Sequence, residues 1–183
     1  MFRSLAAMSF RMSGMTLYRD IGFEQMESIS EVVASKQDGN KKKGDKVFNT
    51  AAAASSSSST NFLIVDVRSA IEVQEMGIIP GAIHIPLNTF GDILQTCDMA
   101  LAGTELTEEQ RDDILSAEKE EREEFEEVFG VPKPTPSTHT LVIYCQSGMR
   151  SMVASDMAEE LGYKGVLHYK GGFGEWARRC RKE

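Results

Sequence analysis

The sequence predicts an α/β protein organised around a mostly parallel sheet. Short apolar stretches of strand length alternate along the chain with stretches that have the helical period. Residues 62–65 are apolar throughout, which is typical of a strand buried on both faces of its sheet. The same succession of apolar strand, polar turn and helix recurs from residue 141 onward. This alternation favours a parallel sheet with helices on both of its faces.

The first half of the chain predicts three helices and two strands. A helix over 23–34 is indicated by apolar residues that recur every three or four positions, namely Phe23, Met26, Ile29 and Val33. Strand 62–65 is followed by a helix over 69–76, which Gly77 can end. A turn at residues 80–81 leads into a short strand over 82–85. Asn88 is a favourable N-cap, so a third helix is predicted from there to about Met99.

The second half predicts a charged helix followed by two more strands. Residues 104–127 are rich in acids, which indicates a solvated helix that Gly130 can end. An extended connection then leads to the strand at 141–144, because it contains Pro132, Pro134 and Pro136. A helix over 149–161, a strand over 165–169 and a C-terminal helix after residues 171–172 complete the chain. Sites in such sheets form where strands end, so we expect Asp66 and Cys145 to be neighbours.

The composition restricts the functions that the chain can have. Its formal net charge of −8 disfavours nucleic acid and anionic membrane surfaces as general partners. No apolar run approaches the roughly 20 residues that a membrane-spanning helix needs. The three cysteines and three histidines have no metal-binding spacing, so we expect neither a metal site nor a cofactor. The odd number of cysteines, without a secretory signal, indicates a reducing compartment.

Two segments have compositions that do not suit a folded core. Residues 1–16 carry arginine, serine and threonine but no acid, which is typical of a mitochondrial transit peptide; the alternative is a disordered tail. The chain is therefore expected in the mitochondrion or the cytoplasm. Residues 38–60 are first lysine-rich and then a run of alanine and serine. They are predicted to be a low-complexity insertion in a domain that spans residues 17–182.

The most informative stretch for function is the one that surrounds Cys145. An apolar strand delivers this cysteine into a short polar turn, and a helical pattern opens at about Met149. Backbone N–H groups in such a turn point inward and bind an anion. A thiolate is itself an anion, so the same groups lower the pKa of the cysteine from its free value of about 8.5. The pattern therefore predicts a nucleophilic cysteine.

Two classes of cysteine enzyme fit this loop poorly. Cysteine phosphatases and arsenate reductases use a C-x5-R loop, whereas Cys145 and Arg150 form C-x4-R. The shorter ring of N–H groups fits the outer sulfur of a persulfide better than it fits a phosphoryl group. A cysteine protease or amidase needs a histidine base, for which His84 and His168 are weak candidates.

Four segments resemble the rhodanese family and occur in that family's order. They are residues 66–68 (DVR), 79–86 (IPGAIHIP), the cysteine loop and 171–176 (GGFGEW). Residues 125–134 (FEEVFGVPKP), together with the loop, are similar to the single-domain thiosulfate sulfurtransferases of eukaryotes, some of which use glutathione as acceptor. The resemblance covers about residues 17–182. It implies one rhodanese-like domain with a mostly parallel five-stranded sheet.

The resemblance also implies a mechanism of two displacements. The Cys145 thiolate takes the outer sulfur of thiosulfate, or of another persulfide donor, and sulfite leaves. The persulfide is then held by the loop that comprises Gln146, Ser147, Gly148, Met149, Arg150 and Ser151. Glutathione, thioredoxin or cyanide accepts the sulfur, and no general acid is needed because sulfite leaves readily. We expect a monomer. The rival function is a binding or regulatory module without turnover, which the presence of Cys145 disfavours.

The residues around the loop each have two interpretations. Arg150 either attracts an anionic substrate or ties the loop to a carboxylate such as Asp66, and we favour the tie. Asp66 and Arg68 are expected to be scaffold rather than chemistry, and Trp176 either walls the pocket or packs in the core. Gln146 and Glu72 stand where relatives have arginine, and the resemblance therefore implies weak thiosulfate binding at neutral pH.

Overall fold

Five strands and six helices account for most of the residues that the structure describes. This structure is a computed structural model and describes residues 18–38, 61–95 and 107–181. The strands are β1 (Arg19–Ile21), β2 (Asn61–Asp66), β3 (Ala82–His84), β4 (His139–Tyr144) and β5 (Leu167–Tyr169). The helices are α1 (Phe23–Asp38), α2 (Ala70–Met76), α3 (Leu87–Leu94), α5 (Glu108–Phe129), α6 (Met149–Glu160) and α7 (Gly172–Cys180). The predicted leader and almost all of the predicted insertion lie outside the described residues.

The sheet has the strand order β1-β5-β4-β2-β3, and every pair of neighbouring strands is parallel. This confirms the predicted α/β class with a five-stranded sheet. Strands β2 and β4, which are neighbours inside the sheet, end in four consecutive buried residues each. Their register pairs Asp66 with Tyr144, so the two strands end side by side. Asp66 and Cys145 therefore lie close together, as predicted.

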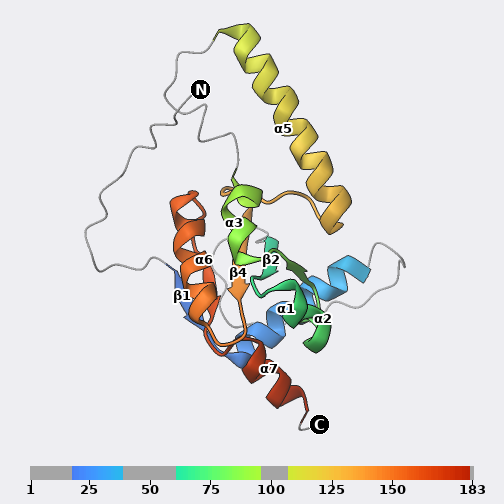
Figure 1. The fold of residues 1–183 in the computed structure, drawn as a ribbon, viewed down its shortest axis with the longest axis vertical. Helices are drawn as coiled ribbons and strands as arrows, with labels where there is room; N and C mark the ends of the chain where they lie inside the picture. Colours follow the sequence, from blue (N-terminus) through green and yellow to red (C-terminus); the bar gives the residue numbers. More distant parts are fainter. Residues whose placement is uncertain (1–17, 39–60, 96–106, 182–183) are drawn as a thin grey trace, which may run out of the picture.

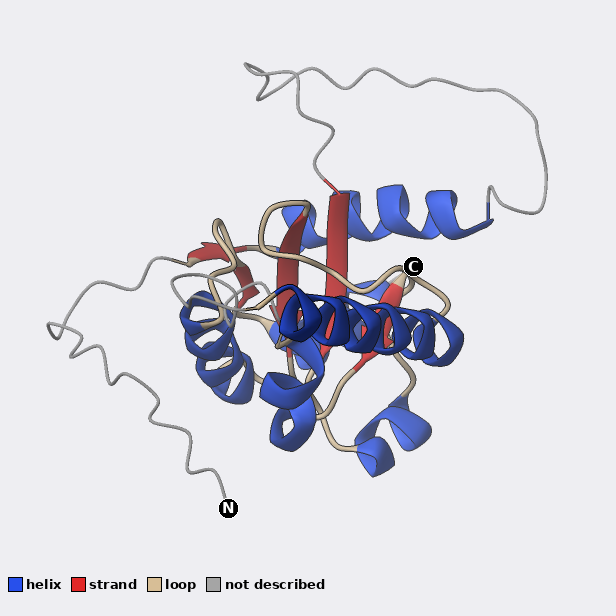
Figure 2. Ribbon diagram, turned by 90° about the horizontal axis from the view of Figure 1, so that it is seen from above, coloured by secondary structure: helices blue, strands red, loops and turns tan. Residues whose placement is uncertain are grey.

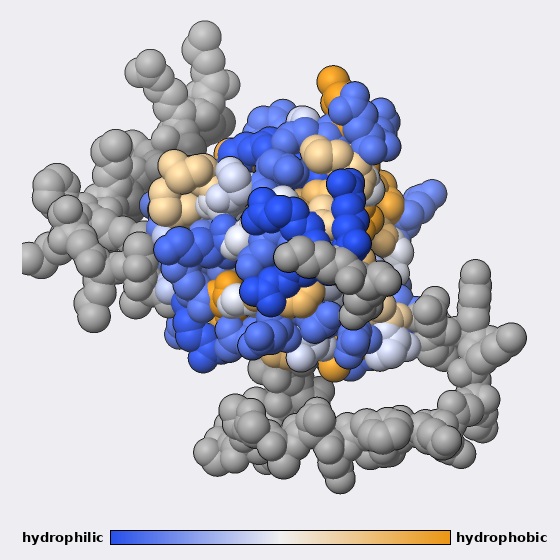
Figure 3. All heavy atoms as spheres, turned by 90° about the horizontal axis from the view of Figure 1, so that it is seen from below, coloured by the Kyte–Doolittle hydropathy of each residue, from blue (hydrophilic) through white to orange (hydrophobic). Residues whose placement is uncertain are grey.

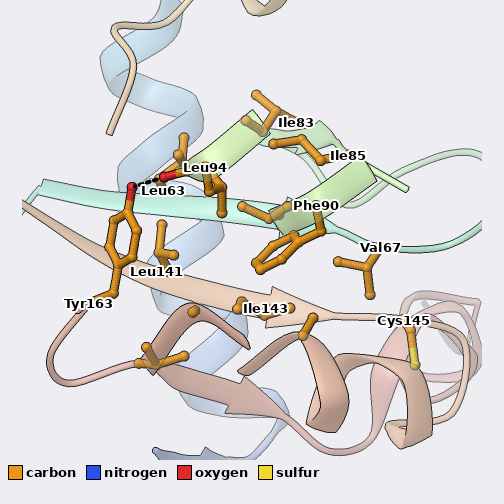
Figure 4. Close-up of a cluster of buried hydrophobic side chains, with 14 of the residues drawn as sticks. Leu63, Val67, Ile83, Ile85, Phe90, Leu94, Leu141, Ile143, Cys145 and Tyr163 are labelled. Atoms are coloured by element: carbon orange, nitrogen blue, oxygen red, sulfur yellow. Dashed lines mark hydrogen bonds between the residues drawn. The ribbon is translucent and has the colours of Figure 1, made fainter. Parts of the chain in front are cut away.

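Helices cover both faces of the sheet (Figure 1). On one face, α3 and α6 pack over the strands, and Phe125 near the end of α5 joins the same apolar cluster. On the other face, α1 and α7 contribute Met26, Val33 and Phe173 to a second cluster. Figure 2 shows the strands between these two layers of helices. Cys145 is the member of the first cluster that lies where β4 ends (Figure 4).

One strand and both ends of helix α3 differ from the prediction, besides shifts of a few residues in other elements. β1 was not predicted, because three residues of which only Ile21 is buried give no periodic signal. Helix α3 begins at Leu87 behind Pro86 and so leaves Asn88 inside its first turn, since a helix start does not need the N–H that proline lacks. The same helix ends at Leu94 rather than near Met99, because Gln95 already has an extended backbone.

The surface of the described part of the chain is mainly polar. Seen from the side on which Figure 1 places α7, apolar atoms form separate patches on a hydrophilic background (Figure 3). Helix α5 points away from the sheet in Figure 1 and exposes most of its acids, as predicted for a solvated helix. Within the ranges described above, no helix combines the length and the apolar character that crossing a membrane requires.

Candidate active site

The loop that follows β4 surrounds the Cys145 sulfur with hydrogen-bond donors. Cys145 is buried, and Gly148 has a φ of 92°, a left-handed conformation that glycine adopts readily. This conformation turns the Gly148 N–H onto the Cys145 Sγ at 3.1 Å. The Ser151 hydroxyl, in the first turn of α6, reaches the same sulfur at 3.4 Å. Strand, loop and helix start are therefore arranged as the sequence predicts.

These donors determine the ionisation of the thiol. Burial raises the pKa of Cys145, but hydrogen bonds from the Ser151 hydroxyl and from the backbone N–H groups of Ser151, Ser147 and Gly148 lower it. The net result is a Cys145 pKa below the ordinary value of a cysteine. A buried thiol whose anionic form is favoured by neutral donors can act as a nucleophile without a directly bonded base.

The start of α7 holds the other side of the loop. The N–H groups of Phe173 and Gly174 donate to the carbonyls of Cys145 and Gln146, at 2.8 and 3.1 Å. The backbone approaches this closely because Gly172 has no side chain; a Cβ there would meet the Cys145 oxygen at 2.5 Å. The carbonyls of Cys145 and Gln146 therefore point toward α7, and the N–H groups of the loop remain available for the sulfur.

A buried ion pair lies beneath the loop. Arg68 and Asp66 are both fully buried and form a salt bridge of 2.7 Å. The Arg68 guanidinium also donates to the Gly77 carbonyl at 2.6 Å and lies 4.0 Å from the ring centre of Phe173. It reaches the Gln146 amide oxygen at 3.5 Å. Arg68 thus connects β2, the end of α2, α7 and the loop.

The structure corrects the partner of Arg150. We expected Arg150 to meet a carboxylate such as Asp66, but its two terminal guanidinium nitrogens donate to the Glu72 carboxylate, each at 2.6 Å. Asp66 is already occupied by Arg68, whereas Glu72 projects from α2 toward the loop. Glu72 also accepts from Ser69 at the helix start. The tie between loop and carboxylate is therefore present, but it runs to α2.

The Glu72–Arg150 pair contributes to stability above acidic pH. The hydrogen bond from Arg150 lowers the pKa of Glu72 from 4.5 to about 2; partial burial opposes this, and hydrogen bonds from Ser69 add to it. Because the folded state prefers the ionised carboxylate, the contribution is complete above about pH 4.5. It is lost as the pH falls toward 2. Arg150 is partly exposed, so the contribution is on the order of 1 kcal/mol.

Trp176 and the remaining loop residues have different environments. The Trp176 ring is partly buried, lies 5.4 Å from that of Phe23 and packs against the cluster on the α1 face. Gln146 is half-buried, whereas Ser147 and Met149 are exposed at the loop surface. Gln146 and Met149 thus present neutral side chains beside the cysteine, with no cation of their own.

Sequence reasoning missed the environment of His168. The sequence offered His168 only as a weak candidate for a base, but its Nε2 atom lies 3.0 Å from the Ser151 Oγ. The other weak candidate, His84, forms its hydrogen bond with the Arg68 carbonyl at 2.9 Å. The sequence contains one indication of this position: His168 is a polar residue between two apolar residues of a short strand. Strand pairing, which places His168 opposite Ile143, was needed to interpret it.

Comparisons with known proteins agree with this arrangement. A model of the rhodanese-like domain family matches residues 49–179. A mouse protein named thiosulfate sulfurtransferase/rhodanese-like domain-containing protein 3 is 33% identical over 116 residues. The match covers 63% of this chain and 58% of the mouse protein, so the chain spans less than two thirds of that relative. The human thiosulfate:glutathione sulfurtransferase is 29% identical over 116 residues, which cover 63% of this chain and 79% of that protein.

Two further matches concern the compartment and the fold. A Schizosaccharomyces pombe protein whose name carries the words thiosulfate sulfurtransferase and mitochondrial is 27% identical over 139 residues, 76% of this chain and 78% of its own length. The solved structure of the human single-domain sulfurtransferase TSTD1 superposes with a TM-score of 0.52. That match has 22% identity and covers 87% of this chain and 96% of the human one, so it shows a shared fold.

Proposed function

The chain belongs to the rhodanese-like domain family, and we propose that it is a sulfurtransferase whose nucleophile is Cys145. The observation that carries the proposal is the buried Cys145 sulfur, which accepts hydrogen bonds from Gly148 N–H and the Ser151 hydroxyl. These donors stabilise a thiolate before transfer. The same loop of N–H groups suits the negative outer sulfur of a persulfide after transfer.

The proposed reaction consists of two displacements at sulfur. The Cys145 thiolate attacks the outer sulfur of thiosulfate; a new S–S bond forms, and the old S–S bond breaks with its electron pair on the departing sulfite. An acceptor thiolate then attacks the outer sulfur of the persulfide, and Cys145 leaves as the thiolate. No net oxidation occurs, and no proton must reach the leaving group.

Intact-mass analysis tests the first displacement directly. After treatment with thiosulfate and removal of excess reagent, we expect the protein to gain one sulfur atom, and we expect Cys145→Ser to gain none. Cys180→Ser is the matched control, because Cys180 is an exposed thiol outside the loop. It should load sulfur as the unaltered protein does.

Other results would redirect the assignment. A chain that loads no sulfur from thiosulfate or from a small persulfide would contradict the proposal and favour a binding module. Hydrolysis of an aryl phosphate that vanadate inhibits would indicate a cysteine phosphatase instead. Sulfur that loads equally on Cys145→Ser would mean that another thiol reacts.

The natural donor is proposed to carry less negative charge than thiosulfate. Glu72 neutralises Arg150, and Gln146 adds no cation, so the loop offers little free positive charge to a dianion. We expect Glu72→Gln to lower the KM for thiosulfate roughly fivefold, which corresponds to about 1 kcal/mol. The glutamine still accepts at the start of α2 but releases the Arg150 charge. Steady-state kinetics with thiosulfate as the varied substrate measures the change.

A neighbouring carboxylate supplies the control for charge. Glu75→Gln removes the same charge from α2 at an exposed position, and should leave the KM for thiosulfate nearly unchanged. Equal effects of the two substitutions would mean that net charge alone attracts the donor. An unchanged KM in Glu72→Gln would show that Arg150 does not meet thiosulfate.

The proposed acceptor is a thiol, with glutathione as the first candidate. This is supported by the name of the human relative and by the neutral, half-buried Gln146 that follows Cys145 in the loop. Turnover of the loaded enzyme with glutathione, thioredoxin or cyanide identifies the acceptor. The composition of residues 1–16 and the name of the S. pombe relative support a mitochondrial location, with the cytoplasm as the alternative.

A further inference from the structure

A continuous line of hydrogen bonds connects Cys145 to a carboxylate at the edge of the sheet. The Cys145 Sγ accepts from the Ser151 hydroxyl at 3.4 Å, and the Ser151 Oγ lies 3.0 Å from the His168 Nε2. The His168 Nδ1 lies 2.8 Å from the Asp20 Oδ1. The members come from α6, β5 and β1, so parallel pairing of β1 with β5 is what completes the line.

The partners of His168 determine which of its atoms carry protons. The Nδ1 atom faces a carboxylate oxygen, which only accepts. The Nε2 atom lies 3.0 Å from the Gly148 carbonyl oxygen, which also only accepts. Each ring nitrogen therefore fits its partner as a donor, Nδ1 toward the Asp20 carboxylate and Nε2 toward the Gly148 carbonyl.

This arrangement also directs the single proton of the Ser151 hydroxyl. The Gly148 carbonyl accepts from His168 and from the Met152 N–H at 3.1 Å, which occupies both of its lone pairs. The Ser151 hydroxyl could instead donate to the Gly148 carbonyl oxygen at 3.1 Å, but His168 and the Met152 N–H already occupy that oxygen. The hydroxyl proton is thus left with the Cys145 sulfur.

We propose that Asp20 and His168 are positioning residues that hold the Ser151 hydroxyl proton on the Cys145 sulfur. The proposal rests on the proposed role of Cys145 as the nucleophile. Asp20 fixes the orientation of the ring, and the His168 Nε2 donates to the Gly148 carbonyl, which closes that acceptor to the Ser151 hydroxyl. Ser151 in turn donates to the sulfur, which stabilises the anionic form that attacks the donor and that leaves when the acceptor reacts.

The surroundings of His168 place it between solvent and the loop. The ring itself is buried, whereas the Asp20 side chain is about half exposed and opens into a cavity of about 390 Å³. Residues with different charges line this cavity, namely Tyr18, Arg19, Asp20, Met152, His168 and Lys170. Lys170 Nζ lies 3.9 Å from Asp20 Oδ2. Asp20 is therefore the member of the line that faces solvent.

Tyr18 adds a neutral neighbour on this side of the ring. Its ring meets that of His168 edge-on, with centroids 5.5 Å apart. Burial, followed by the carboxylates of Asp156, Asp20 and Glu159, raises the pKa of Tyr18. The phenol therefore stays protonated over the pH range of the experiment. Asp156 and Glu159 are the acids that α6 adds to this environment.

The pH dependence of Cys145 alkylation tests the proposal without any sulfur donor. The rate with iodoacetamide is followed at the Cys145 peptide by mass spectrometry. We expect His168→Leu to move the midpoint of the rate profile upward by about one pH unit, because Ser151 is no longer directed to the sulfur. His168→Gln keeps a donor near the Nε2 position and should restore most of the shift. Asp20→Asn should give a smaller upward shift.

Two comparisons separate positioning from a general loss of structure. Tyr163→Phe removes a buried hydroxyl that donates to the Pro134 carbonyl at 2.8 Å, and it should leave the midpoint unchanged. Ser151→Ala should raise the midpoint itself, and adding His168→Leu to it should raise it no further. An unchanged midpoint in His168→Leu, or an equal shift with and without Ser151, would overturn the proposal. If His168→Leu shifts the alkylation midpoint but the unaltered protein loads no sulfur, the positioning role of His168 would be supported and the sulfurtransferase assignment contradicted.

Discussion

Arg68→Met is expected to lower the free energy of unfolding by about 3–5 kcal/mol, because it leaves a fully buried carboxylate without its partner. Asp66 and Arg68 both have no solvent exposure. The substitution also removes the donor that Arg68 gives to the Gly77 carbonyl and the packing on the Phe173 ring. Denaturant titration at neutral pH measures the loss. The same variant should load sulfur slowly, because Gln146 loses a partner beneath the loop.

A double-substitution cycle shows whether the ion pair causes the effect. Asp66→Asn alone leaves a buried cation and should also be strongly destabilising. The combined variant should lose clearly less than the sum of the two single losses, since neither charge remains. Lys119→Ala breaks the exposed Lys119–Glu123 pair and should change stability very little. Additive losses in the cycle would contradict a direct role for the pair.

The parts of the fold that sequence predicts well are those fixed by neighbouring residues. The apolar runs that became β2 and β4 are buried as predicted, and the pattern around Cys145 gives the strand, loop and helix start. Ser69 and Glu72 form the capping box at the start of α2, close to the predicted helix start. In each case the hydrogen bonds or the burial involve residues a few positions apart.

The parts that sequence does not predict depend on the packing of distant segments. Glu72 and Arg150 are 78 positions apart, and only the placement of α2 against the loop makes them partners. Asp20 and His168 are 148 positions apart and meet through the pairing of β1 with β5. A strand as short as β1 has no period, so neither the strand nor its contribution to the cysteine environment is visible in the sequence.

Gly148→Ala is expected to reduce persulfide formation by at least about a hundredfold, because the loop can no longer hold its donors on the sulfur. An added Cβ at Gly148 would lie 2.5 Å from the carbonyl oxygen of Lys170, the residue that follows β5. The φ of 92° is also strained for alanine. Relief requires rotation of the two peptide groups that flank Gly148, one of which carries the N–H that faces Cys145 and the other the carbonyl that faces His168. The mass gained per unit time after thiosulfate addition measures the loss.

Gly130→Ala separates this local effect from the general cost of a positive φ. Gly130 has a φ of 68° at the end of α5, and an added Cβ there meets nothing within 4 Å. Gly130→Ala should lower the free energy of unfolding by about 1 kcal/mol. Neither the rate of sulfur loading nor the pH profile of Cys145 alkylation should change. Gly148→Ala should instead slow loading and shift that profile upward together, since one N–H serves both the thiolate and the persulfide. Slow loading with an unshifted profile would mean that Gly148 provides space for the donor rather than stabilisation of the sulfur anion.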